Sequence, residues 1–409
     1  MNKIIFFIFI SELLLLTIGI IKTPTWGDEL NFHAPLAQNI SWEKIIDADS
    51  NYSSAYTPLP YIIGNLFYRI KASLYTLRIV NGLVYILTII VVFKLFSQID
   101  KTNALALTAL TSLNPYLFRA GYIYLMSNYG ILFALTGIYV YFYLQGAKRL
   151  WLSHICWMAA VLSMQWILLV YVAFVIYEFE LFVLERKDYK AFAKLFLLKI
   201  ISLLPALYLF WCWQGLTHPN FHSHTLASSI AHVDAVLSVL GFWFFLFIIT
   251  EIKKLKRKIV AWLIFLVPVL LLNLPKHAAK HGLFVITGIA SAFCKKTEQI
   301  LQIPYSVSTA VLVLAGVLLL VMLWNNDGLD DFQRTMLYMV SGLFTAFAVS
   351  TLLGASHIFI AMPFILFIPA KKPVQNRKLF SGLVFQYFVM SIAYNGYIIF
   401  FRSHAMFFN

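Results

Sequence analysis

An adjacent Asp–Glu pair directly after a long apolar segment is the feature of this 409-residue sequence best suited to chemistry. The segment runs from Gly27 to Gln38 and contains Asp28, Glu29 and His33. Carboxylates beside a bilayer are costly to desolvate and tend to mark function. One placed there can act as a general base toward a hydroxyl group. The structural alternative is that Asp28 caps a helix that begins near Glu29.

A basic residue follows at the start of the next long apolar segment, in Arg78-Ile79-Val80-Asn81. An Arg at that depth needs an anionic partner, and a phosphate in the headgroup layer is a natural one. The alternative is an Arg side chain that simply extends from a span into the interface. The sequence leaves both interpretations open.

Metal-binding patterns are weak. His218 and His222 have a spacing that suits one helix face for zinc, but Pro219 intervenes and no carboxylate or cysteine is adjacent. We therefore favour hydrogen bonding to an acceptor or a phosphate. Asp47 and Asp49 have the spacing of a metal-binding pair, but their polar neighbours are typical of a loop. We predict no metal and no cofactor. The cysteines lie in or beside apolar segments, where they are expected to pack (Cys156, Cys212 and Cys294).

The elements that position these residues must be membrane helices. Hydrophobic residues make up 61% of the chain and charged residues 12%, whereas a soluble domain carries about 25% charged residues. In lipid every backbone polar group must be satisfied internally, and the apolar segments are long and continuous, which favours helices over a barrel. We predict an all-α polytopic integral membrane protein with about 11–13 transmembrane helices. Residues 1–409 would form one transmembrane domain.

Charge predicts the orientation. The net charge is +14, but the basic residues form short clusters between apolar segments, as orientation signals do, without a nucleic-acid-binding motif. With residue 1 in the cytoplasm, the main outer loops are 22–75, 214–234 and 275–305. Within the first of them, an apolar stretch that begins at Tyr56 ends at Arg69, too short to cross. It predicts a helix lying in the interface, with Pro near its first turn.

These motifs together resemble the GT-C superfamily of membrane glycosyltransferases that use polyprenyl-phosphate sugars. The stretch from Asp28 to Gln38 is similar to the Asp-Glu…His-x-Pro-x-Ala-Gln motif of the dolichyl-phosphoglucose-dependent α-1,2-glucosyltransferases, with one extra residue before His33. Arg78-Ile79-Val80-Asn81 matches the Arg-Phe-Val-Asn of that family. Gln165 matches the Gln of its Arg-Gln-Thr-Asn motif, although the Arg is missing here. The resemblance covers about the first 180 residues.

The resemblance implies an inverting transfer of a sugar from a polyprenyl- or dolichyl-phosphate donor to a glycan, lipid or protein acceptor outside the cytoplasm. Asp28 would be the general base, with Glu29 beside it as the other catalytic candidate. The leaving lipid monophosphate needs cations, for which we expect Arg78, Arg119, Lys276 and Lys280. We expect substrate contacts from His33, Gln38, Gln165, His218, His222, His224 and His357. The enzyme would lie in a bacterial inner membrane or the ER membrane.

Two other classes of protein have the same general composition. A transporter or lipid flippase would show ionisable residues deep within its spans and often an internal repeat, and no repeat is evident. A non-catalytic membrane assembly factor could retain the same scaffold. Catalysis through Asp28 separates this last class from an enzyme.

Overall fold

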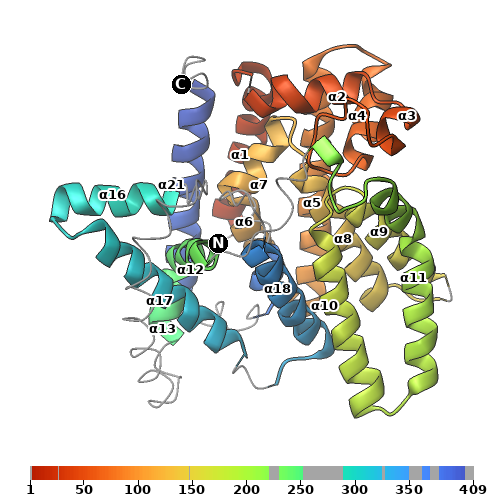
Figure 1. The fold of residues 1–409 in the computed structure, drawn as a ribbon. Helices are drawn as coiled ribbons and strands as arrows, with labels where there is room; N and C mark the ends of the chain where they lie inside the picture. Colours follow the sequence, from red (N-terminus) through yellow and green to blue (C-terminus); the bar gives the residue numbers. More distant parts are fainter. Residues whose placement is uncertain are drawn as a thin grey trace. The chain divides into compact units, whose positions relative to one another are not determined.

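The computed structural model describes residues 2–25, 27–146, 148–220, 230–251, 289–324, 328–349, 362–368 and 377–400. Over these ranges the chain forms helices and their connections, and no strand (Figure 1). The prediction of an all-α protein is confirmed. The chain divides into two compact units, one formed by Met1–Thr225 with Val384–Asn409 and the other by Leu226–Leu383.

The first unit holds the N-terminal helices. Its elements are α1 (Asn2–Lys22), η1 (a short π-helix, Glu29–His33), α2 (Ala34–Gln38), α3 (Trp42–Ile46), α4 (Leu59–Tyr68), α5 (Leu74–Ile99), α6 (Ala104–Ser112), α7 (Pro115–Tyr122), α8 (Ser127–Tyr143), α9 (Arg149–Val161), α10 (Ile167–Phe179), η2 (Glu180–Glu185) and α11 (Tyr189–Cys212). The part of α21 (Arg377–Phe400) from residue 384 onward also belongs to this unit.

Six helical segments in the described residues are long and apolar enough to cross a membrane: Ile4–Lys22, Leu74–Ile99, Ile167–Glu185, Tyr189–Cys212, Tyr305–Trp324 and Ser381–Phe400. A seventh would be the pair α7–α8, which is bent by 112° at its break. The protein is therefore an integral membrane protein, as predicted. The number of 11–13 spans stays a prediction, since one expected span at 259–274 lies outside the described residues.

One predicted span is broken in the structure. The apolar segment 103–118 predicts one helix, but α6 ends at Ser112 and α7 begins at Pro115. The Asn114 side chain caps α7 by accepting from the backbone N–H groups of Tyr116 and Leu117, at 3.1 and 3.2 Å. An Asn-Pro pair in this position is a helix start, which periodicity alone does not reveal.

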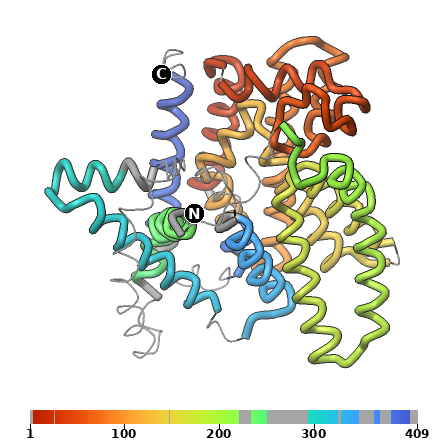
Figure 2. Tube along the Cα trace, viewed as in Figure 1, coloured from red at the N-terminus to blue at the C-terminus, as the bar shows by residue number. Residues whose placement is uncertain are grey.

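The first loop folds as short helices between the spans α1 and α5, as expected. Figure 2 shows α2, α3 and α4 as a red-to-orange group beyond the end of α1. Pro58 directly precedes helix α4, and Pro60 lies in its first turn. The backbone N–H groups at these positions have no partner within a helix, so proline is tolerated there. Its predicted end at Arg69 is the residue that follows its last turn.

The second unit contains α12 (Ile230–Trp243), α13 (Phe245–Glu251), α16 (Ile289–Leu301), α17 (Tyr305–Trp324), α18 (Asp331–Val349) and α20 (Met362–Phe367). Helices α12 and α17 approach most closely at Gly241 and Gly316. A Cβ at Gly241 would lie 1.9 Å from the carbonyl oxygen of Leu312, and one at Gly316 would lie 2.1 Å from that of Leu237. Backbone contact through glycines is how membrane helices pack most tightly.

A buried ion pair joins two spans of the first unit. Lys199 on α11 donates to Glu178 on α10, and both side chains are buried. The Lys199 ammonium also lies 4.5 Å from the centre of the Phe174 ring. One turn away, the Tyr171 hydroxyl lies 2.9 Å from His154 Nδ1 on α9. Buried polar contacts thus hold α9, α10 and α11 together.

Removing the charge of one member of this pair should destabilise the protein far more than removing both charges. Lys199→Met leaves Glu178 charged and unpaired, which costs about 3–5 kcal/mol of unfolding free energy, whereas an apolar pair of similar volume is close to neutral. We expect a large drop in apparent Tm in detergent for Lys199→Met and a small one for Glu178→Leu/Lys199→Met. Equal losses for the two variants would contradict this interpretation.

Candidate active site

The structure joins the two sequence motifs of the first loop through a buried ion pair. The Glu29 side chain is 0% exposed and that of Arg78 is 2% exposed. Arg78 donates from Nε to Glu29 Oε1 at 2.8 Å and from Nη2 to Glu29 Oε2 at 2.6 Å. Glu29 Oε1 also accepts from the backbone N–H of Tyr124 at 2.8 Å. The pair therefore links η1 to α5 and to the bend between α7 and α8.

The remaining N–H groups of Arg78 hold the end of the first span. Nη1 donates to the carbonyl oxygens of Ile20 and Thr23, at 3.3 and 2.9 Å, and Nη2 donates to that of Pro24 at 3.3 Å. All five donors of the guanidinium are thus committed to protein acceptors. The anionic partner of Arg78 in this structure is Glu29, and its predicted contact with a donor phosphate stays a prediction.

The same geometry separates the roles of the adjacent carboxylates. Glu29 is enclosed by its partners, whereas the Asp28 side chain is exposed. The backbone of Asp28 is itself helical, with φ −65° and ψ −37°, and its side chain makes no capping hydrogen bond. The helix-cap alternative is therefore not what the structure shows. Glu29 thus has a structural role in this arrangement, and its predicted part in catalysis stays a prediction.

Asp28 and Arg119 both affect the pKa of the Tyr56 phenol. Burial is the main reason that the pKa of Tyr56 is raised to about 12; the Asp28 carboxylate adds to the increase and the Arg119 guanidinium opposes it. Burial also holds the pKa of Tyr61 well above its usual value, and Asp28 contributes to that increase as well. Asp28, just before η1, and Arg119, on α7, are thus both near enough to Tyr56 to affect the pKa of its phenol.

Arg119 is held at this place by aromatic side chains. Its Nη1 donates to the Tyr394 hydroxyl of α21 at 2.8 Å, and its guanidinium lies 5.1 Å from the centre of the Tyr116 ring. One residue further along α21, Asn395 Oδ1 accepts from the Tyr122 hydroxyl at 2.7 Å. These contacts fix the Arg119 guanidinium between α7 and α21.

His33 lies within the same loop but is buried. Its Nδ1 is 2.8 Å from the Tyr61 hydroxyl, which in turn is 2.6 Å from Ser54 Oγ. Burial lowers the pKa of His33 to about 4, so the imidazole is neutral at pH 7. The ring also makes an edge contact with Tyr56, with centroids 5.8 Å apart. His33 therefore orients the aromatic residues next to Asp28 and carries no charge of its own.

Two further residues predicted to bind substrate instead fix the loop. Gln165 is 3% exposed and donates to the carbonyl oxygen of Ala55 at 2.6 Å, next to Tyr56. His218 is fully buried, stacked on Tyr52 with centroids 5.3 Å apart and 3.1 Å from the carbonyl oxygen of Asp47. These contacts give both side chains a role in loop packing, and their predicted substrate contacts stay predictions.

Some of the other candidate residues lie within the described ranges, and the rest lie outside them. Gln38 is half-buried at the end of α2, where its carbonyl oxygen accepts from Asn65 at 3.2 Å. Asp47 Oδ1 accepts from the backbone N–H of Asp49, so this pair forms a local turn. Within the described ranges no group of three potential metal ligands occurs. The rest lie outside the described residues: His222, His224, Lys276, Lys280 and His357.

Sequence reasoning missed the aromatic part of this site. Tyr56 is fixed through its backbone: its N–H donates to Ser54 Oγ at 3.0 Å and its carbonyl oxygen accepts from the Tyr52 hydroxyl at 2.8 Å. The next residue, Thr57, donates to the carbonyl oxygen of Val161 at the end of α9 at 3.0 Å. The density of tyrosines in 52–61 was the available signal, but tyrosine is also common at membrane interfaces.

Comparison with known proteins finds similarity to solved structures at low sequence identity. Neither a protein-family model nor a curated protein matches the sequence. Among solved structures, the chain is similar to apo ArnT from Cupriavidus metallidurans, with 13% identity, a TM-score of 0.45, and coverage of 97% of this chain and 77% of that one. For the same protein bound to undecaprenyl phosphate the values are 14%, 0.43, 97% and 78%. At such identities, functional conclusions must come from this chain's own residues.

Loss of the Glu29 charge should destabilise the protein. Glu29→Gln leaves the Arg78 guanidinium buried without a counter-ion, which costs about 3–5 kcal/mol of unfolding free energy. We expect a clear drop in apparent Tm in detergent. Glu43→Gln, at an exposed carboxylate on α3, is the matched control and should leave Tm unchanged. A Glu29→Gln variant as stable as the parent would show that the pair does not hold the loop.

Proposed function

We propose that this chain is a GT-C glycosyltransferase that moves one sugar from a polyprenyl-phosphate donor to an acceptor outside the cytoplasm, with inversion at the anomeric carbon. The observation that carries the proposal is the exposed Asp28 carboxylate directly after the first span, in the same region as the Arg119 guanidinium of α7, since both affect the pKa of Tyr56. It supplies a base and an oxyanion-binding cation beside the end of the first span, where a lipid phosphate lies. The family motif around Asp28 supports the same assignment.

In the proposed step, the Asp28 carboxylate takes the proton of the acceptor hydroxyl as its oxygen attacks the anomeric carbon. The new glycosidic C–O bond forms while the bond between that carbon and the phosphate oxygen breaks. The electron pair leaves with the lipid monophosphate. Arg119 stabilises the developing charge on the phosphate, and the acceptor proton remains on Asp28 until it passes to solvent.

The surrounding residues have positioning roles in this proposal. The pair of Glu29 and Arg78 fixes η1 and thereby the backbone of Asp28. Because Arg78 neutralises Glu29, Asp28 is not opposed by a second bare carboxylate on the adjacent residue. Tyr394 holds the Arg119 guanidinium from α21. Neutral His33 keeps Tyr61 in place without competing for the proton.

The buried pair of Glu178 and Lys199 is the observation that would favour a transporter, since ionisable groups within spans often line transport pathways. Here, however, each charge is neutralised by the other, and a neighbouring contact joins Tyr171 to His154. A closed pair of this kind stabilises helix packing. We therefore retain the transferase proposal, with transport or a non-catalytic scaffold as the alternatives.

The decisive assay compares donors. Purified protein in EDTA with a polyprenyl-phosphate sugar should transfer the sugar, because a monophosphate leaving group needs a cation such as Arg119 and no metal. The parallel reaction uses a nucleotide sugar with manganese. Activity with the nucleotide sugar alone would overturn the proposal, and inactivity with all sugars and acceptors tested in both reactions would favour a scaffold.

Within that assay, Asp28→Asn should reduce the rate by about 10²–10⁴-fold, the usual contribution of a general base. The apparent Tm should stay close to that of the parent, because the side chain is exposed and makes no cap. Glu43→Gln again controls for loss of an exposed carboxylate in the same loop and should retain full activity. Full activity of Asp28→Asn would remove Asp28 from the mechanism.

A further inference from the structure

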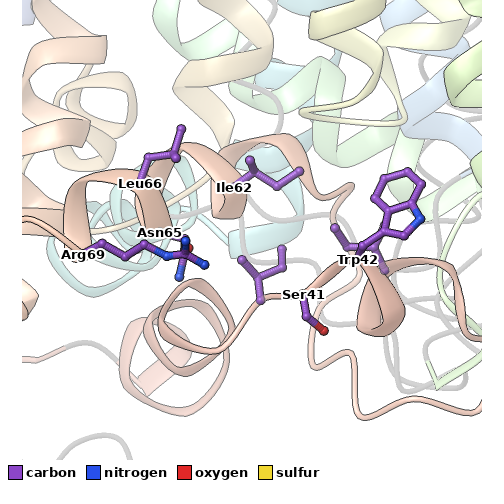
Figure 3. Close-up of a pocket in the computed structure, with 8 residues that line it drawn as sticks. Ser41, Trp42, Ile62, Asn65, Leu66 and Arg69 are labelled. Atoms are coloured by element: carbon purple, nitrogen blue, oxygen red, sulfur yellow. The ribbon is translucent and has the colours of Figure 1, made fainter.

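A second site is suggested by a groove in the first loop, on the side of α4 that does not contact His33. The groove has a volume of about 290 Å³ and lies between α4 and the segment that joins α2 to α3. Figure 3 shows Ile62 and Leu66 on α4 and Arg69 at its C-terminal end, with Ser41 and Trp42 on the opposite wall. Arg69 lies at one end of the groove and Trp42 at the other. Its walls are thus apolar, with one cation at the end.

The place of this groove in the chain puts it at the boundary of the membrane. Arg69 comes five residues before Leu74, the first residue of the 26-residue span α5. Around it, the side chains of Leu66, Phe67 and Ile70 are 59%, 41% and 81% exposed. Large apolar side chains that alternate with basic ones just before a span are typical of the interface, where apolar groups meet acyl chains and basic groups meet headgroups.

The charges around the groove favour an anion. The Arg69 side chain is exposed and forms no ion pair within the described ranges. Lys44 lies on α3 next to Glu43. The excess charge is positive even with Glu43 included. The planar guanidinium of Arg can bind two phosphate oxygens at once.

The wall of the groove is preformed. Asn65 Nδ2 donates to the carbonyl oxygens of Ala37 and Gln38, at 2.8 and 3.2 Å, and so fixes α4 against the end of α2. On α3, the Ser41 side chain caps the helix by accepting from the backbone N–H of Lys44. Both walls are therefore held by hydrogen bonds that do not involve Arg69 or Trp42. A ligand would meet these side chains without having to order the loop.

We propose that this groove binds the headgroup of an anionic phospholipid of the surrounding bilayer, with the phosphate on Arg69 and part of an acyl chain against Trp42 and Leu66. The site is separate from the one formed around Asp28. The two sites use different residues: Tyr61 contacts His33, whereas Ile62, Asn65, Leu66 and Arg69 line the groove. The proposal does not depend on glycosyl transfer. The bound phospholipid would anchor the first loop at the membrane surface.

The test uses the full-length chain in nanodiscs and phospholipids with brominated acyl chains, which quench tryptophan fluorescence on contact. Brominated phosphatidylglycerol is compared with brominated phosphatidylcholine. The contribution of Trp42 is the difference between the parent and Trp42→Phe. We expect phosphatidylglycerol to quench Trp42 more strongly than phosphatidylcholine does, and Arg69→Gln to weaken this preference by about tenfold in apparent affinity, as expected when a charge-assisted phosphate contact is lost.

Lys71→Gln is the matched control, since it removes the same charge two residues away but outside the groove. At about 0.15 M salt an exposed charge is largely screened, so this variant should stay within about threefold of the parent. Equal effects of the two variants would replace the site by diffuse surface attraction. No quenching of Trp42 by either lipid would overturn the proposal. Stronger competition by polyprenyl phosphate than by phosphatidylglycerol would assign the groove to that lipid and contradict ours.

Discussion

The ion pair of Glu29 and Arg78 joins four parts of the chain at one buried point: the end of α1, the turn of η1, the start of α5 and the bend between α7 and α8. A carboxylate or guanidinium buried alone would be strongly destabilising, so neither side chain can leave without the other. The η1 turn is thereby fixed against the spans. Asp28 directly precedes Glu29, so its backbone is held in place although its side chain is exposed.

The same constraint shapes the electrostatics of the candidate site. Of the two adjacent carboxylates, Arg78 neutralises Glu29, and the charge presented to the surface is that of Asp28. The opposite charge is supplied by Arg119, which α21 and the aromatic residues of α7 hold from another direction. Tyr56 lies within the influence of both. The enclosed pair of Glu29 and Arg78 supports the fold, whereas the Asp28 side chain is exposed.

Much of this architecture follows from the sequence, because apolar composition and the length of the apolar segments dictate membrane helices. The position of Asp28 after the first span and the proline start of α4 could be predicted in the same way. The partner of Arg78 could not, since a bilayer phosphate and a buried carboxylate satisfy a guanidinium equally well, and Glu29 is 49 residues away. Gln165 and His218 were assigned to substrate because a polar residue in a loop and one that holds a loop look alike in sequence. The contribution of Tyr394 depends on a helix more than 270 residues after Arg119.

The most direct measurement is a cryo-EM structure of the full chain in nanodiscs with polyprenyl phosphate bound. The account predicts that the phosphate oxygens contact the Arg119 guanidinium beside Asp28, while the pair of Glu29 and Arg78 stays closed. A phosphate bound to Arg78, with Glu29 displaced from it, would contradict the account. So would a phosphate remote from both Asp28 and Arg119.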